Sequence, residues 1–176
     1  MKTLKNILSA FALVALFTVS ATAQSSDNAT VNASATIVGS LTVSNVTNIA
    51  FGDVATSETP TIASTDAGAG SVSVSGATSG QSLNVSILYP ATLDNIDGTE
   101  VSFDTYSATY RTDGTTTPAG SSALTGASLV GQTLTGSYTA NANTAYIFVG
   151  GQIDNMLTAV AGNTYTGTIT VTVSYN

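Results

Sequence analysis

The sequence predicts an all-β fold, an antiparallel β-sandwich, on three observations. Apolar and polar residues alternate with a period of two in short runs, which is typical of half-buried strands. Threonine and valine, which suit pleated surfaces, are abundant, whereas the helix formers Glu, Lys, Arg and Gln are scarce. Glycine, asparagine and aspartate separate the runs at short intervals. Many short strands with frequent turns indicate a sandwich.

Nine segments are expected to form strands. In chain order they are 29–37, 41–46, 49–54, 71–75, 82–89, 101–108, 132–139, 145–150 and 165–175. Residues 95–98 and 112–114 have the composition of turns, and the segments 64–70 and 114–128, rich in Ser, Gly, Ala and Thr, are expected to be loops. No clean internal repeat divides the chain, so one domain is expected.

The most regular alternation lies in the C-terminal segment. One face carries Tyr165, Gly167, Ile169, Val171, Val173 and Tyr175, and the other carries only threonine and serine. A half-buried strand places its apolar side chains on one face, so we expect Ile169, Val171 and Val173 to point into the core. A strand this regular is expected to have a neighbour, from the same chain or from another.

The segment 28–37 alternates almost as regularly near the N-terminus. One face carries Ala29, Val31, Ala33, Ala35 and Ile37. Together with the C-terminal strand it has the pattern of two complementary edges, which predicts that it pairs with another copy of the chain. The pattern fits equally well an ordinary first strand that pairs within its own domain.

The N-terminus has the features of a secretory signal peptide. Lys2 and Lys5 precede an apolar run over 7–19, and the small-x-small triplet at 21–23 predicts cleavage before Gln24. We therefore expect a signal peptide at 1–23, an N-terminal extension at 24–38 and a β-sandwich domain at 39–176. A retained membrane anchor is the alternative interpretation of the same apolar run. No other segment is apolar enough to span a bilayer, so we expect no membrane contact after cleavage.

Charge excludes several classes of partner. Removal of the signal takes both lysines and leaves ten acidic residues against Arg111, a net charge near −9. Phosphate backbones and anionic membrane surfaces are bound by cationic side chains, so neither nucleic acid nor a membrane is an expected partner. The chain has no cysteine, so disulfides cannot stabilise it outside the cell.

The chain lacks most catalytic side chains, so we expect no enzyme and no cofactor. It has no histidine or cysteine, which excludes the usual nucleophile–base pairs and thiolate or imidazole metal sites. The densest acidic stretch contains Asp94, Asp97, Glu100 and Asp104. A solvated acidic loop is the expected interpretation, while a weak calcium site and a carboxylate-based hydrolase are the alternatives. No residue is therefore assigned as catalytic or metal-binding.

Two motifs and their order resemble a known family. The segment 49–54 contains Phe51 and Gly52 in an apolar-x-Phe-Gly-x-apolar pattern, and 162–175 contains a Gly-x-x-Tyr segment followed by alternating apolar residues. With the leader, the extension and a Gly-flanked 71–75 strand, this order is similar to that of the spore-coat-U-like secreted domains, which include major pilins of archaic chaperone–usher pili. A strand phenylalanine followed by glycine is usually structural, so Phe51 is expected in the core and Gly52 at a bend.

The resemblance implies an incomplete immunoglobulin-like sandwich that lacks its last strand. In the family, the N-terminal extension of the next subunit fills the groove by donor-strand exchange. It therefore implies a structural pilin, exported to the surface of a bacterium as part of an adhesive pilus or fimbria. The partners would be neighbouring copies, a periplasmic chaperone and an outer-membrane usher. Polymerisation by another route, and a monomeric surface-binding module for a ligand such as carbohydrate, remain open alternatives.

Overall fold

The computed structural model describes residues 32, 34–141, 143–154, 156 and 159–176. The chain divides into two units, Met1–Thr36 and Ile37–Asn176. The second unit is an antiparallel β-sandwich with no α-helix among its described residues, which confirms the predicted fold class. The described residues include no helix that is both long and apolar enough to span a bilayer.

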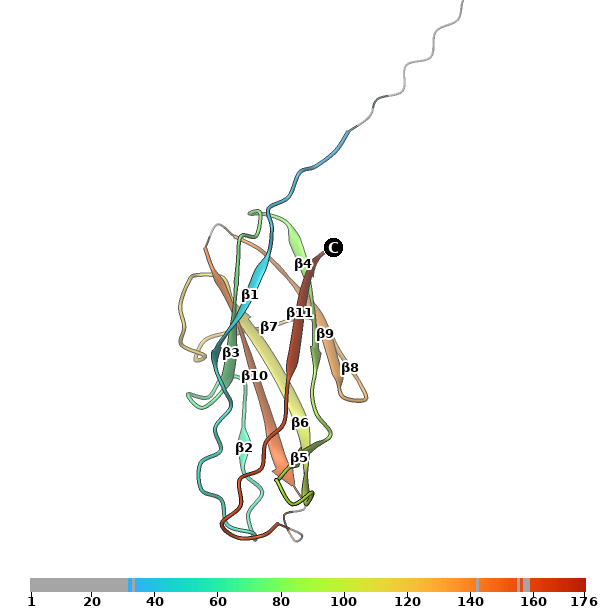
Figure 1. Cartoon of the computed structure of the whole chain (residues 1–176). Coiled ribbons are helices and arrows are strands. Elements are labelled where there is room, and N and C mark those ends of the chain that lie inside the picture. The colour runs from blue at the N-terminus through green and yellow to red at the C-terminus, as the bar shows by residue number, and fades with distance from the viewer. Residues whose placement is uncertain (1–31, 33, 142, 155, 157–158) are drawn as a thin grey trace, which may run out of the picture. The chain divides into compact units, whose positions relative to one another are not determined.

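Within the described part of the chain, eleven strands form two antiparallel sheets (Figure 1). The first sheet has the order β1-β3-β10-β6-β5, with β2 paired to β10 and β7 paired to β6. Its strands are β1 (Thr42–Thr47), β2 (Thr61–Ile62), β3 (Gly70–Ser75), β5 (Thr92–Asp94), β6 (Glu100–Arg111), β7 (Ser122–Ala123) and β10 (Ala145–Asp154). The second sheet has the order β11-β4-β9-β8 and contains β4 (Ser82–Leu88), β8 (Thr125–Val130), β9 (Thr133–Thr139) and β11 (Thr170–Tyr175).

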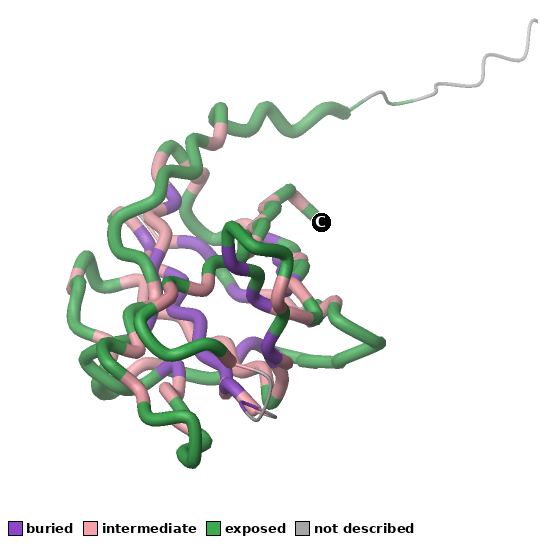
Figure 2. Tube along the Cα trace, turned by 60° about the horizontal axis from the view of Figure 1, so that its bottom comes forward, coloured by how far each residue is buried: buried purple, intermediate pink, exposed green. Residues whose placement is uncertain are grey.

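The core lies between the facing sides of the two sheets, where the buried residues gather (Figure 2). The alternation of the sequence accounts for it, because every second side chain of a strand points inward. In β4, for example, Leu83, Val85 and Ile87 are almost fully buried and the residues between them face outward. The first sheet supplies Phe103 and Ile147 from its two central strands.

Most strand predictions are confirmed, and the differences have physical causes. No strand forms at 49–54, and the C-terminal strand begins at Thr170 instead of at residue 165. The predicted loop at 114–128 contains β7 and the first part of β8. Every residue of β8 is exposed. This edge strand therefore has no buried face, and its sequence lacks the apolar–polar alternation that predicts a strand.

Hydrogen bonds define two opposite ends of the sandwich. At the proximal end, where the chain enters from residue 37, Gly39 donates to the Thr78 hydroxyl (2.7 Å), and the Thr78 N–H donates to the hydroxyl of Tyr175 (3.0 Å). At the distal end, Asp94 and Thr166 exchange two backbone hydrogen bonds of 2.9 Å. β1 runs from the proximal to the distal end, and β11 runs the opposite way.

Candidate functional site: an apolar groove between two edge strands

A groove of about 1080 Å³ opens between the two sheets. It is flanked on one side by the end of β1 and the segment after it, and on the other by the segment leading into β11. Its floor is made by buried apolar side chains, namely Leu93, Val101, Phe103, Val149, Ile153 and Met156. Polar residues such as Asn45, Asn48 and Asp53 also belong to the lining, so the groove combines an apolar floor with polar walls.

β11 is an edge strand whose inner face is only partly covered. It pairs with β4 alone among the described strands. Val171 and Val173 lie opposite Ile87 and Val85, and residues opposite one another share a face of the sheet. The two β4 residues are 0% and 2% exposed, whereas Val171 and Val173 are half-buried. The alternating exposure of β11 agrees with the predicted inward face, and the core lacks cover along this edge.

The inner face of β1, the edge strand of the other sheet, is also only partly covered. It pairs only with β3 among the described strands, and all six of its residues are exposed. Val43 lies opposite Val74, which is 1% exposed, so both side chains face the core. Val43 is nevertheless 36% exposed. Both edge strands therefore carry apolar side chains on their inner faces that the described residues cover only in part.

Phe51 and Gly52 lie in a loop that lines the groove. The ring of Phe51 makes an edge-to-face contact with that of Phe103, with centroids 6.2 Å apart, and packs against the core although it is only partly buried. Gly52 has a φ of 70°, which favours glycine and turns the chain. The expected strand at 49–54 is therefore wrong, while the packing role of Phe51 and the bend at Gly52 agree with the sequence analysis.

The distal end of the groove is closed by the segment 159–167. The Tyr165 hydroxyl accepts hydrogen bonds from the Val160 N–H (2.8 Å) and from the Asn95 side chain (3.4 Å). A side chain at Gly167 would meet Leu93 at 2.7 Å, so glycine lets the chain cross between the sheets. Tyr165 thus fixes a corner before β11 instead of belonging to the strand, and Ile169 packs against the core from the same segment.

The candidate donor residues fall largely outside the described part of the chain. Ala29, Val31 and Ala33 lie outside the described residues. Ala35 and Ile37 are described; neither is in a strand, and Ile37 is 92% exposed. A strand over 34–37 is therefore not formed in this structure.

The acidic stretch is organised as a turn. Asn95 is buried, and its side-chain oxygen accepts hydrogen bonds from the N–H groups of Asp97 (2.9 Å) and Thr99 (2.8 Å). Asp97 in turn accepts a hydrogen bond from the side chain of Asn163 at 3.1 Å. The described residues contain no group of three potential metal-ligating side chains.

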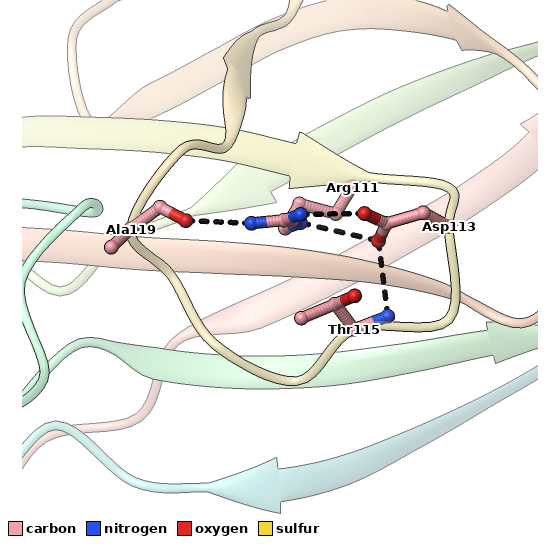
Figure 3. Close-up of polar contacts among 4 residues, drawn as sticks. All are labelled: Arg111, Asp113, Thr115 and Ala119. Atoms are coloured by element: carbon pink, nitrogen blue, oxygen red, sulfur yellow. Dashed lines mark hydrogen bonds and ion pairs between the residues drawn. The ribbon is translucent and has the colours of Figure 1, made fainter.

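Arg111 is held by its own loop (Figure 3). Its guanidinium binds both carboxylate oxygens of Asp113, at 2.5 and 3.2 Å, and donates to the carbonyl of Ala119 at 2.6 Å. The hydrogen bonds from Arg111 lower the pKa of Asp113 well below its ordinary value, and the Thr115 N–H adds to the shift. The arginine therefore braces a loop and lies outside the groove lining.

Comparison with protein-family models, with curated proteins and with solved structures gave no match for this chain.

Proposed function

We propose that this chain is a structural subunit of an extracellular filament, in which the extension of one copy fills the groove of the next. The observation that carries the proposal is the pair of edge strands, β1 and β11, with half-exposed inner faces on either side of an apolar groove. An added strand would complete the second sheet by pairing with β11 and would cover the exposed core.

The extension has the composition that such a groove requires. Its candidate donor segment, the nine residues 29–37, spans about 30 Å when extended. Burying Val31 and Ile37 contributes roughly 1.5–3 kcal/mol each. The three alanines contribute less by area, but they let the strand lie close to the floor. Each backbone hydrogen bond to β11 adds about 0.5–1.5 kcal/mol net.

Strand direction favours donation between copies over insertion into the same copy. All pairings in both sheets are antiparallel, and antiparallel pairs are the more common kind. Residue 37 leads directly into the proximal end of its own sandwich. A segment 29–37 inserted in its own groove would therefore run parallel to β11. A segment donated by another copy can run antiparallel to it.

Donation between copies gives a filament. The donating and accepting surfaces differ, so the contact is head-to-tail, and a head-to-tail contact that does not close on itself yields a filament instead of a ring. The signal-like N-terminus and the resemblance to archaic chaperone–usher pilins support export to a bacterial surface, with a periplasmic chaperone covering the groove and an outer-membrane usher exchanging it for the next extension.

The test uses the full-length mature protein with changes in the extension alone. Ala33→Arg and Ile37→Asp place a charge on the inserted face and should abolish filaments seen by electron microscopy while leaving a folded, exported monomer. Thr36→Asp, on the opposite face, is the matched control and should still polymerise. Unchanged filaments in Ala33→Arg and Ile37→Asp would contradict the proposal, as would a wild-type protein that remains monomeric.

A further inference from the structure

Ile96 is the most exposed large apolar residue of the described chain, at 98%. It lies at the tip of the turn between β5 and β6, at the distal end of the sandwich. A solvent-exposed isoleucine on a mobile loop would be unremarkable, because isolated apolar residues are common on surfaces. The turn around Ile96, however, is held in place from several sides.

The turn is fixed by a buried side chain, by its own backbone hydrogen bonds and by the segment before β11. Asn95 is 8% exposed, and its side-chain oxygen accepts hydrogen bonds from the N–H groups of Asp97 and Thr99, which follow Ile96 in the turn. Backbone hydrogen bonds from Gly98 to Asn95 (3.1 Å) and from Asn95 to Thr99 (3.0 Å) close the turn. Asn163 binds Asp97 from the segment before β11. Ile96 is thus presented to solvent by a rigid support.

The short link between the extension and the sandwich determines which part of a donating copy lies near this turn of the accepting copy. Four residues, 38–41, separate the candidate donor segment 29–37 from β1, and they span about 13 Å when extended. Gly39 is bound to Thr78 at the proximal end. If the extension of one copy runs antiparallel to β11 of the next, its residue 37 lies at the distal end of the accepting copy. The proximal end of the donor must then lie within this short distance of that distal end.

We infer that the turn carrying Ile96 is a docking point for the proximal end of the neighbouring copy, formed by residues 38–40 and the turn 76–80. This inference rests on the proposed strand donation. The exposed Val38 (39%) supplies an apolar partner on the donor side, and Val160 (49%) extends the apolar surface near the distal turn. The contact would fix the angle between successive subunits, which the inserted strand alone leaves to a flexible link.

The charges of the two ends are compatible with this contact. The distal turn and its neighbours carry Asp94, Asp97 and Glu100. Residues 38–41, 76–81, 140–141 and 143–144 of the proximal end contain no charged side chain and several amides and hydroxyls. An acidic end that meets an uncharged, hydrogen-bonding end avoids the repulsion that two acidic ends would suffer.

Cross-linking tests the contact in assembled filaments. The chain has no cysteine, so a cysteine pair can be placed without background. Ile96→Cys combined with Ser79→Cys, both at exposed positions, should give a ladder of covalent oligomers on a denaturing gel after treatment with a short bismaleimide. Ser128→Cys combined with Ser79→Cys, with Ser128 exposed on β8, is the matched control and should give no ladder.

A second variant tests the mechanical role. Ile96→Asp should lower the persistence length of the filaments seen by electron microscopy, without changing the affinity of the groove for a peptide of residues 28–38. Val130→Asp, at another exposed apolar position (76%), should change neither property. Filaments that form without the Ile96 ladder, or that give an equal ladder from Ser128, would overturn the docking point while strand donation stands. A wild-type chain that forms no filaments would overturn both.

Discussion

Two buried tyrosines differ in whether their hydroxyl group has a hydrogen-bond partner, and this difference affects what each residue contributes to stability. Tyr89 and Tyr138 are both 2% exposed and both stack on a second tyrosine. The Tyr89 hydroxyl donates to the carbonyl of Ser107 at 2.8 Å. The Tyr138 hydroxyl is buried without a hydrogen-bond partner among the described residues. A buried polar group without a partner loses its hydration and gains nothing in return.

Tyr138→Phe should therefore leave the stability unchanged or raise it, because the change removes an unsatisfied hydroxyl and keeps the ring. Tyr89→Phe is the matched contrast and should lower the free energy of unfolding by about 1 kcal/mol, because it leaves the Ser107 carbonyl without its donor. Urea unfolding of the two variants checks the difference. A larger loss of unfolding free energy for Tyr138→Phe than for Tyr89→Phe would contradict the conclusion that the Tyr138 hydroxyl has no hydrogen-bond partner.

At the scale of single elements, the alternation of the sequence predicted the inward face of β11 and the main strands of both sheets. The alternation gave a wrong prediction where apolar residues lie in a loop. Ile49, Phe51 and Val54 cover the core without forming a strand, because Gly52 turns the chain in between. β8 was missed for the opposite reason, since an edge strand exposed on all sides has no apolar period.

The two faces of β11 provide a direct test at this scale. Val171→Asp places a carboxylate on the half-buried inner face and should lower the free energy of unfolding by about 1–3 kcal/mol. Thr170→Asp changes an exposed position of the same strand and should be tolerated. Thermal unfolding of the two mature proteins compares them. Equal stability would show that the inward face of β11 is wrongly assigned.

At the scale of the whole sandwich, the groove results from contacts between distant parts of the sequence. β1 and β11 lie near opposite ends of the chain and belong to different sheets. The sequence indicated unmatched apolar faces in the segment 28–37 and in the C-terminal strand, but it did not indicate one in β1. It did not indicate that Leu93, Phe103 and Met156 would form the floor between them, because these contacts depend on how the sheets pack. The corner at Tyr165 depends on the same packing.

The sandwich should also lose stability at alkaline pH. Burial raises the pKa of Tyr138 to about 12 and raises that of Tyr89 still further. A raised pKa means that folding favours the neutral phenol, so this stability is fully present below the ordinary value of about 10 and declines as the pH rises through the folded-state value. Urea titrations between pH 9 and about 12 should show this decline, and Tyr138→Phe should reduce it. A stability that does not vary over this range would contradict the burial of both rings.

The central claim, that the groove accepts the extension of another copy, is tested most directly by binding of a peptide of residues 28–38 to the chain that starts at Gly39. The account predicts saturable binding by calorimetry, a higher melting temperature, and slower hydrogen exchange of the amides of β11. The same peptide carrying Ala33→Arg should have none of these effects. A stable monomer that does not bind the wild-type peptide, with exchange at β11 unchanged, would contradict the account.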